Sequence, residues 1–211
     1  FVTVLTTLIS TGLGVFISVL RMNKKRWMRL VGSIYINLFR NIPPVPLLLF
    51  LVFGLPNIFP SISGRFFPVG MEFMLLIAGL SLNTSSYIAE ILRSGIRAVP
   101  QVHYDTAKIH GLGPIAICVR VIYPQALRIS LPALGTRLIH NMKNSSVALV
   151  LPLPVNSMEV LGQAGRIAGQ TFAWVEPLIL AAAVYLSFAI VLSIFVNRMV
   201  RKEQKKIEII Q

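Results

Sequence analysis

Long uncharged stretches of apolar residues are the feature that most restricts how this chain folds. A helix needs ~20 mostly apolar residues to cross the hydrocarbon core of a bilayer, and five stretches meet that length. Of the 211 residues, 55% are hydrophobic and only 13% are charged, whereas about a quarter are charged in an ordinary soluble domain. We therefore expect one all-α transmembrane domain over residues 1–211. The predicted spans are residues 1–20, 30–54, 71–92, 129–151 and 177–196, with soft boundaries.

The basic residues are distributed in a way that predicts the orientation of these spans. Of 20 Lys and Arg residues, five lie in each of the segments 21–29, 93–128 and 197–211, whereas 55–70 and 152–176 carry one each. Cytoplasmic loops are enriched in Lys and Arg, so this alternation places the N-terminus outside and the C-terminus inside. The net charge of +13 then reflects topology. Anionic lipid headgroups are the expected partner, and nucleic acid is not.

Prolines interrupt the second predicted span. Pro43, Pro44 and Pro46 follow Arg40 and Asn41 within it. Because proline removes a backbone donor and clashes with the preceding turn, we expect this helix to be kinked or broken here. A broken helix at membrane depth survives only where protein or a water-filled cavity satisfies its free backbone groups. This pattern favours a helical bundle with an interior path.

The segment 93–128 is predicted to contain a short cytoplasmic helix. Pro100 ends the structure before it, residues 101–110 follow as the helix, and Gly111 with Pro114 marks its end, the usual order of helix stop signals. A surface helix between two spans suits the docking of a cytoplasmic partner.

The same segment carries a recognisable signature. It consists of Asp105-Thr106-Ala107, then Gly111, then Val121-Ile122-Tyr123-Pro124. This resembles the E-A-A-x3-G-x9-I-x-L-P motif of the permeases of polar amino acid ABC importers, the histidine/glutamine permease-like family, although Thr106 and Tyr123 depart from it. Further matches to that family lie at residues 38–43, 83–96, 123–128 and 143–146.

The resemblance implies a type I ABC importer-like fold with a cytoplasmic coupling helix. It also implies alternating access driven by a separate ATPase subunit, which binds the ATP and Mg, so no cofactor is expected in this chain. The other implied partners are a second permease copy, identical or related, an extracytoplasmic solute-binding protein and an amino acid substrate. The location is the cytoplasmic (inner) membrane of a prokaryote, with several passes. The predicted ATPase-docking residues are Tyr104, Asp105, Thr106, Ala107, His110, Gly111 and Leu112.

Polar groups inside the spans are the candidates for solute binding, because they are expensive in lipid. The acidic candidate suits an ammonium group, and the amides and hydroxyls suit a carboxylate. Two alternatives stay open: Glu90 forms a structural ion pair with Arg93, and the asparagines join helices by hydrogen bonds. The candidates are Asn83, Ser86 and Glu90, on one face of the third span, and Asn141, Asn144 and Ser145 in the fourth.

Enzymatic motifs are absent from the sequence. No P-loop, H-E-x-x-H or G-x-S-x-G motif occurs, so the chain is not expected to be an enzyme. His103, His110 and His140 with the single Cys118 form no recognisable metal-ligand set. The alternative function is a polytopic channel or facilitator for small polar solutes that uses no ATP, but such a protein does not need the ordered inner segment.

Overall fold

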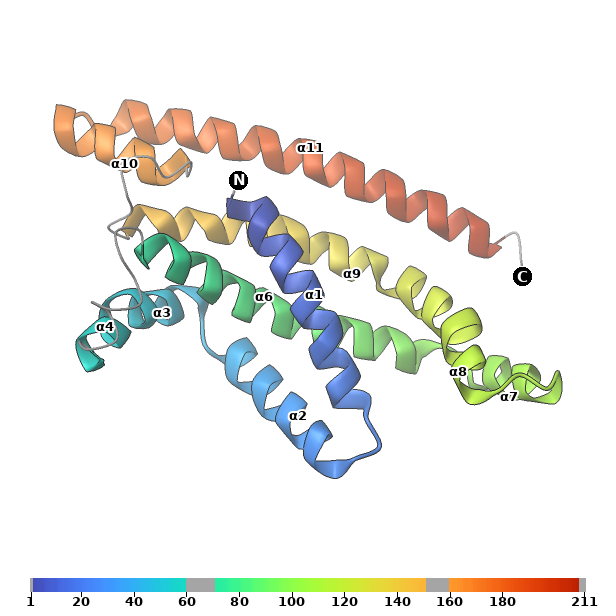
Figure 1. Ribbon diagram of the computed structural model, residues 1–211. Helices are drawn as coiled ribbons and strands as arrows, with labels where there is room; N and C mark the ends of the chain where they lie inside the picture. Colours follow the sequence, from blue (N-terminus) through green and yellow to red (C-terminus); the bar gives the residue numbers. More distant parts are fainter. Residues whose placement is uncertain (1, 60–70, 151–159, 209–211) are drawn as a thin grey trace.

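The computed structural model describes residues 2–59, 71–150 and 160–208, which contain helices and no strand. Residues 60–70 and 151–159, which belong to the predicted outer segments and the end of the fourth predicted span, lie outside this description. Figure 1 shows the helices, which are α1 (Val2–Met22), α2 (Arg26–Asn41), α3 (Pro44–Leu49), α4 (Leu55–Ile58), α6 (Met71–Ala98), α7 (Gln101–Ile109), α8 (Pro114–Ile117), α9 (Tyr123–Asn144), α10 (Val160–Thr171) and α11 (Val175–Glu208).

Four helical stretches are long and apolar enough to cross a membrane. They are Val2–Met22, Met71–Ala98, Pro114–Val147 and Val175–Lys202, and the bent pair of α2 with α3 and α4 provides a fifth candidate. The five predicted spans therefore each have a helical counterpart when the bent pair is counted as one. The orientation of the two chain ends stays a prediction.

The proline-rich stretch breaks the second candidate span, which confirms the predicted break. The helices on either side of it meet at a bend of 103°. Ile42 and Pro43 are extended, with ψ of 122° and 144°, because a residue that precedes a proline is pushed out of the helical region. Beyond α3 the chain continues into a π-helical segment, Phe50–Gly54, and then α4.

α6 is the central helix and α11 the peripheral one. α6 packs against α1, α2, α3 and α9, and Leu76, Leu80 and Ala89 on it are at most 1% exposed. A methyl group added at Gly95 would meet the Ser130 side chain, so the absence of a side chain there allows α9 to approach α6 closely. This packing brings polar residues of α6 and α9 into contact.

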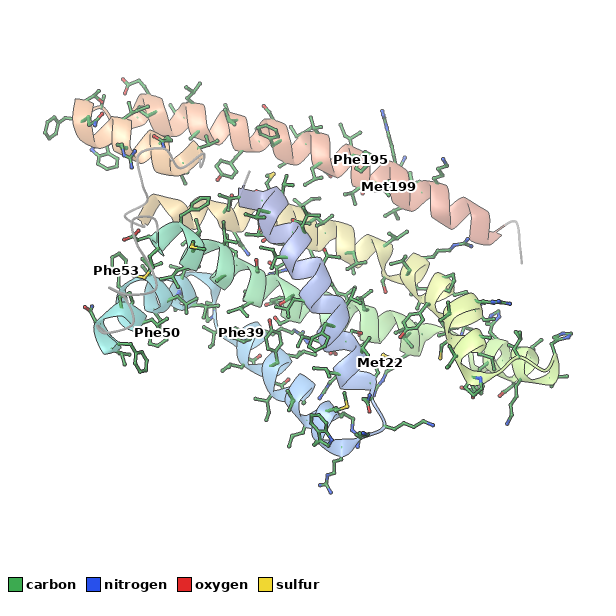
Figure 2. The ribbon with its side chains drawn as sticks, viewed as in Figure 1. Met22, Phe39, Phe50, Phe53, Phe195 and Met199 are labelled. Carbon is green, nitrogen blue, oxygen red and sulfur yellow. The ribbon has the colours of Figure 1, made fainter. Side chains whose placement is uncertain are left out.

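α11 presents apolar side chains to the surroundings. It packs against α9 and α10, and in Figure 2 the side chains of Phe195 and Met199 extend from its ribbon. Leu180 and Val191 are 69% and 66% exposed. Such exposure suits a helix whose outer surface contacts lipid tails.

The segment 93–128 is mostly helical and is not an irregular loop. α6 continues through Ala98, and α8, the π-helical segment Cys118–Ile122 and α9 follow from Pro114. Only residues 99–100 and 110–113 of this segment are non-helical. The apolar run stops at Arg93, but the helix continues through Arg97 to Ala98, because arginine is a good helix former.

The predicted cytoplasmic helix is present as α7, at one end of the molecule beside α8 (Figure 1). Gly111 follows it with φ of +76°, a left-handed conformation that glycine adopts without steric cost. The Leu112 amide then bonds to the Ala107 carbonyl, and the Gly111 amide to the Lys108 carbonyl. This glycine cap turns the chain sharply toward α8.

Candidate functional site

Side chains of α6 satisfy the backbone groups that the prolines leave free. In a helix each carbonyl accepts from the amide four residues later, and for Phe39 and Ile42 those positions are prolines. Asn83, which is 1% exposed, donates from Nδ2 to both carbonyl oxygens, at 2.8 Å and 3.5 Å. The break is therefore held by protein groups, as a break at membrane depth requires.

The Tyr87 side chain likewise takes the role of a missing amide for a third backbone carbonyl, that of Arg40. The amide that would serve the Arg40 carbonyl is absent because Pro44 occupies its position. The Tyr87 hydroxyl donates to this carbonyl at 3.3 Å. Asn83 and Tyr87 lie one helical turn apart on α6, so one face of that helix fixes the end of α2.

Asn141 joins three helices. It is fully buried, and its Oδ1 accepts from Thr84 Oγ1 at 3.0 Å. Its Nδ2 donates to Thr6 Oγ1 at 2.9 Å and to Thr7 Oγ1 at 3.0 Å. Because α1, α6 and α9 all meet at this side chain, Asn141 occupies the position of an interhelical hydrogen-bond residue.

Arg137, one turn before Asn141, reaches the same part of α6. Its Nη2 donates to Asn83 Oδ1 at 2.7 Å and to Thr84 Oγ1 at 3.1 Å. Its guanidinium carbon lies 3.9 Å from the centre of the Tyr87 ring, a cation–π arrangement. The sequence pattern placed Arg137 inside a span but did not select it, although an arginine inside a span is itself the signal.

Glu90 forms an ion pair with Arg93. Arg93 donates to both carboxylate oxygens, from Nε at 2.9 Å and from Nη2. Arg40 Nη1 lies 4.0 Å from the same carboxylate. The side chains of Glu90 and Arg93 are 20% and 16% exposed. The pair corresponds to the structural alternative that the sequence left open for Glu90.

The remaining candidates differ in their surroundings. Ser86 is fully buried and donates to the Asn83 carbonyl at 2.6 Å. Ser145 is 4% exposed, donates to the Met142 carbonyl at 2.8 Å and lies 3.2 Å from the Tyr185 hydroxyl. Asn144 is half-buried at the end of α9. Solute binding by the six candidates stays a prediction.

A polar surface runs along α9 within the membrane-spanning stretch. Thr136, His140 and Lys143 are exposed on it, and Arg137 and Asn144 are half-buried beside them. Each of the other four lies three or four positions from His140, so these five residues, called the α9 polar stripe below, share one side of the helix. Lipid is a poor environment for such a surface.

The second candidate site is the tip of the molecule around α7. Asp105, Thr106, His110 and Gly111 of the predicted docking set are exposed, Tyr104 and Leu112 are half-buried, and Ala107 is buried. The structure adds two apolar side chains that the signature does not include. Ile109 and Ile115 are 85% and 81% exposed, which suits contact with another protein.

Titratable groups do not gather into a metal site in the described part of the chain. No group of three or more His, Cys, Asp or Glu residues that could hold a metal ion occurs there. The arrangement instead provides hydrogen-bond donors on α6 and α9 with the Glu90 carboxylate beside them, and a mixed polar and apolar tip.

The chain is similar to known proteins over most of its length. The family described as "Binding-protein-dependent transport system inner membrane component" matches residues 10–205. A probable amino-acid ABC transporter permease of Bacillus subtilis (strain 168) is 34% identical over 195 residues, which cover 91% of this chain and 80% of that protein. An arginine transport system permease of Corynebacterium glutamicum is 33% identical over 199 residues, which cover 91% of this chain and 61% of that one.

A solved structure shares the fold. The crystal structure of an amino acid ABC transporter with histidines has a TM-score of 0.80 and 29% sequence identity to this chain, with 95% of this chain and 88% of that chain covered.

Proposed function

The chain belongs to the family of binding-protein-dependent transport system inner membrane components, and on this basis we propose that it is the permease subunit of an ATP-driven importer of polar amino acids. Its location is the inner membrane of a prokaryote, which it crosses several times. A separate ATPase binds ATP and Mg, and an extracytoplasmic solute-binding protein delivers the amino acid. The N-terminus lies outside and the C-terminus inside.

The structural observation that best supports this proposal is the α9 polar stripe. His140 and Lys143 are exposed on a helix that otherwise qualifies as a membrane span, and polar side chains in spans ordinarily face a bundle interior or water. A second permease copy packed against this side encloses the stripe and leaves a water-filled path between the copies. Five candidate spans are few for enclosing a path alone, which also supports pairing.

The predicted solute-binding residues take two roles in this proposal. Glu90 and Asn144 are half-buried and provide groups for an ammonium and a carboxylate at the edge of the path. Asn83, Ser86, Asn141 and Ser145 are buried and support the path from behind through their hydrogen bonds. Solute selectivity then depends on how these four buried residues position Glu90 and Asn144.

Transport is coupled to ATP through α7. Residues 99–100 connect α7 to α6, and residues 110–113 connect it to α8 and α9. Because α6 and α9 also carry the polar residues of the membrane interior, a displacement of α7 by the ATPase moves the walls of the path. Rigid-body movement around a central site is the general basis of alternating access.

The test is a reconstitution with a matched pair of variants. Asp105→Lys reverses an exposed charge on α7, and Lys24→Glu reverses an exposed charge between α1 and α2. The chain is co-purified with its ATPase and measured in liposomes for ATP hydrolysis and amino acid uptake. We expect Asp105→Lys to lose ATPase binding and uptake, and Lys24→Glu to keep both. Uptake without ATP, down the solute gradient, would instead establish the channel or facilitator.

A further inference from the structure

The guanidinium of Arg137 has hydrogen-bonding capacity that the described residues leave unused. Both of its hydrogen bonds come from Nη2, although the group carries five N–H donors. Its Nε is buried and has no hydrogen-bond partner among the described residues. Because Nε is enclosed by protein, the donors open to a ligand are those of Nη1, which makes no hydrogen bond with the described residues and is not among the buried atoms.

The charge of Arg137 is likewise uncompensated in the described part of the chain. Glu90, the nearest carboxylate on α6, is paired with Arg93 and Arg40. Arg137 instead contacts the neutral groups Asn83 and Tyr87. A cation held within a span without a carboxylate is costly, and an anion that binds beside it removes that cost.

The surroundings of Arg137 favour a ligand rather than a fixed internal partner. The side chain is half-buried and belongs to the α9 polar stripe, next to the exposed His140 and near Lys143. The Tyr87 ring and the two hydrogen bonds hold the guanidinium in one orientation. Preorganisation of this kind increases affinity, because little side-chain freedom is lost on binding.

We propose that Arg137 binds the α-carboxylate of the transported amino acid, an inference that rests on the proposed function. Guanidinium groups bind carboxylates through short, charge-assisted hydrogen bonds. The α-carboxylate is common to all amino acids. Arg137 therefore recognises the solute as an amino acid and does not distinguish among side chains.

The experiment measures binding to the permease–ATPase complex in nanodiscs, without the solute-binding protein, so that only this chain's specificity is observed. The probe is the radiolabelled amino acid that the wild-type system imports best. It is competed by the same unlabelled amino acid and by its α-carboxamide, in which the carboxylate is replaced. The variants are Arg137→Gln, Arg137→Lys and, as a matched control, Arg97→Gln at an exposed arginine of α6.

We expect the wild type to prefer the amino acid over its α-carboxamide by about tenfold or more, the range of one hydrogen bond to a charged group. Arg137→Gln lowers the affinity for the amino acid by a similar factor and leaves the affinity for the α-carboxamide unchanged, so that the preference disappears. Arg137→Lys and Arg97→Gln keep the preference.

Two results would overturn the proposal. A wild type that binds the amide as well as the amino acid contradicts it without any variant, and so does an assembled Arg137→Gln complex that keeps the preference. Either result leaves the proposed function intact if the wild type imports amino acids. Absence of ATP-dependent amino acid uptake by the wild type counts against the proposed function itself.

Discussion

Replacing Asn141 with alanine removes the side chain at which α1, α6 and α9 meet. Three hydrogen bonds, with Thr84, Thr6 and Thr7, are lost. Interhelical hydrogen bonds in membranes are worth ~0.6 kcal/mol on average, so the three together contribute about 2 kcal/mol to the free energy of unfolding. Thr6 keeps a partner because its hydroxyl also donates to the Val2 carbonyl, whereas Thr84 loses its acceptor.

The assay is reversible unfolding in mixed micelles, with the free energy of unfolding measured for paired variants. Asn144→Ala is the control, because Asn144 is an asparagine three residues away on the same helix but half-buried rather than buried. We expect a change below ~0.5 kcal/mol for it, as for ordinary surface substitutions. A double-mutant cycle with Thr6→Val should give a coupling energy of ~0.6 kcal/mol.

Equal stability losses in the two alanine variants would refute this account of Asn141. So would an Asn141→Ala protein of unchanged stability that has lost amino acid affinity, because that result makes Asn141 a direct solute ligand. The measurement thus decides between the two roles that the sequence left open for the asparagines.

The remaining predictions concern close approach, backbone conformation and docking. Gly95→Ala should lower the free energy of unfolding by ~1–3 kcal/mol, because the new methyl group meets the Ser130 side chain. Gly12→Ala, at a glycine with nothing within 4 Å, should not destabilise the protein in the same unfolding assay. Gly111→Ala forces a non-glycine residue to φ of +76° and should cost ~1–2 kcal/mol in that assay. Ile109→Asp places a charge at a side chain that is 85% exposed and should abolish ATPase co-purification without changing stability; normal co-purification would remove Ile109 from the docking surface.

The features that could be predicted from sequence are those whose causes are local. Prolines act on their own turn, and the break between Asn41 and Pro44 follows from that. Pro100 and Gly111 likewise determine where α7 begins and ends. The apolar runs locate the spans because lipid imposes their length. Each of these signals lies within a few residues of the structure that it specifies.

The contacts that define the candidate site could not be predicted in the same way. Asn83 bonds to the Phe39 carbonyl, 44 residues earlier in the sequence, and Arg137 bonds to Asn83, 54 residues earlier. Such pairings depend on the rotation and depth at which helices pack, which composition does not determine.

The hydroxyl groups of α1 bear on how the protein enters the membrane during synthesis. Thr6 donates to the Val2 carbonyl and Thr11 to the Thr7 carbonyl, both within the helix itself. α1 emerges from the ribosome long before the helix that carries Asn141, and it can partition into lipid alone because these hydroxyls already have acceptors. When Asn141 arrives, it donates to the free lone pairs of Thr6, and no hydroxyl has to give up a bond. Insertion and assembly of this helix are thereby separable in time.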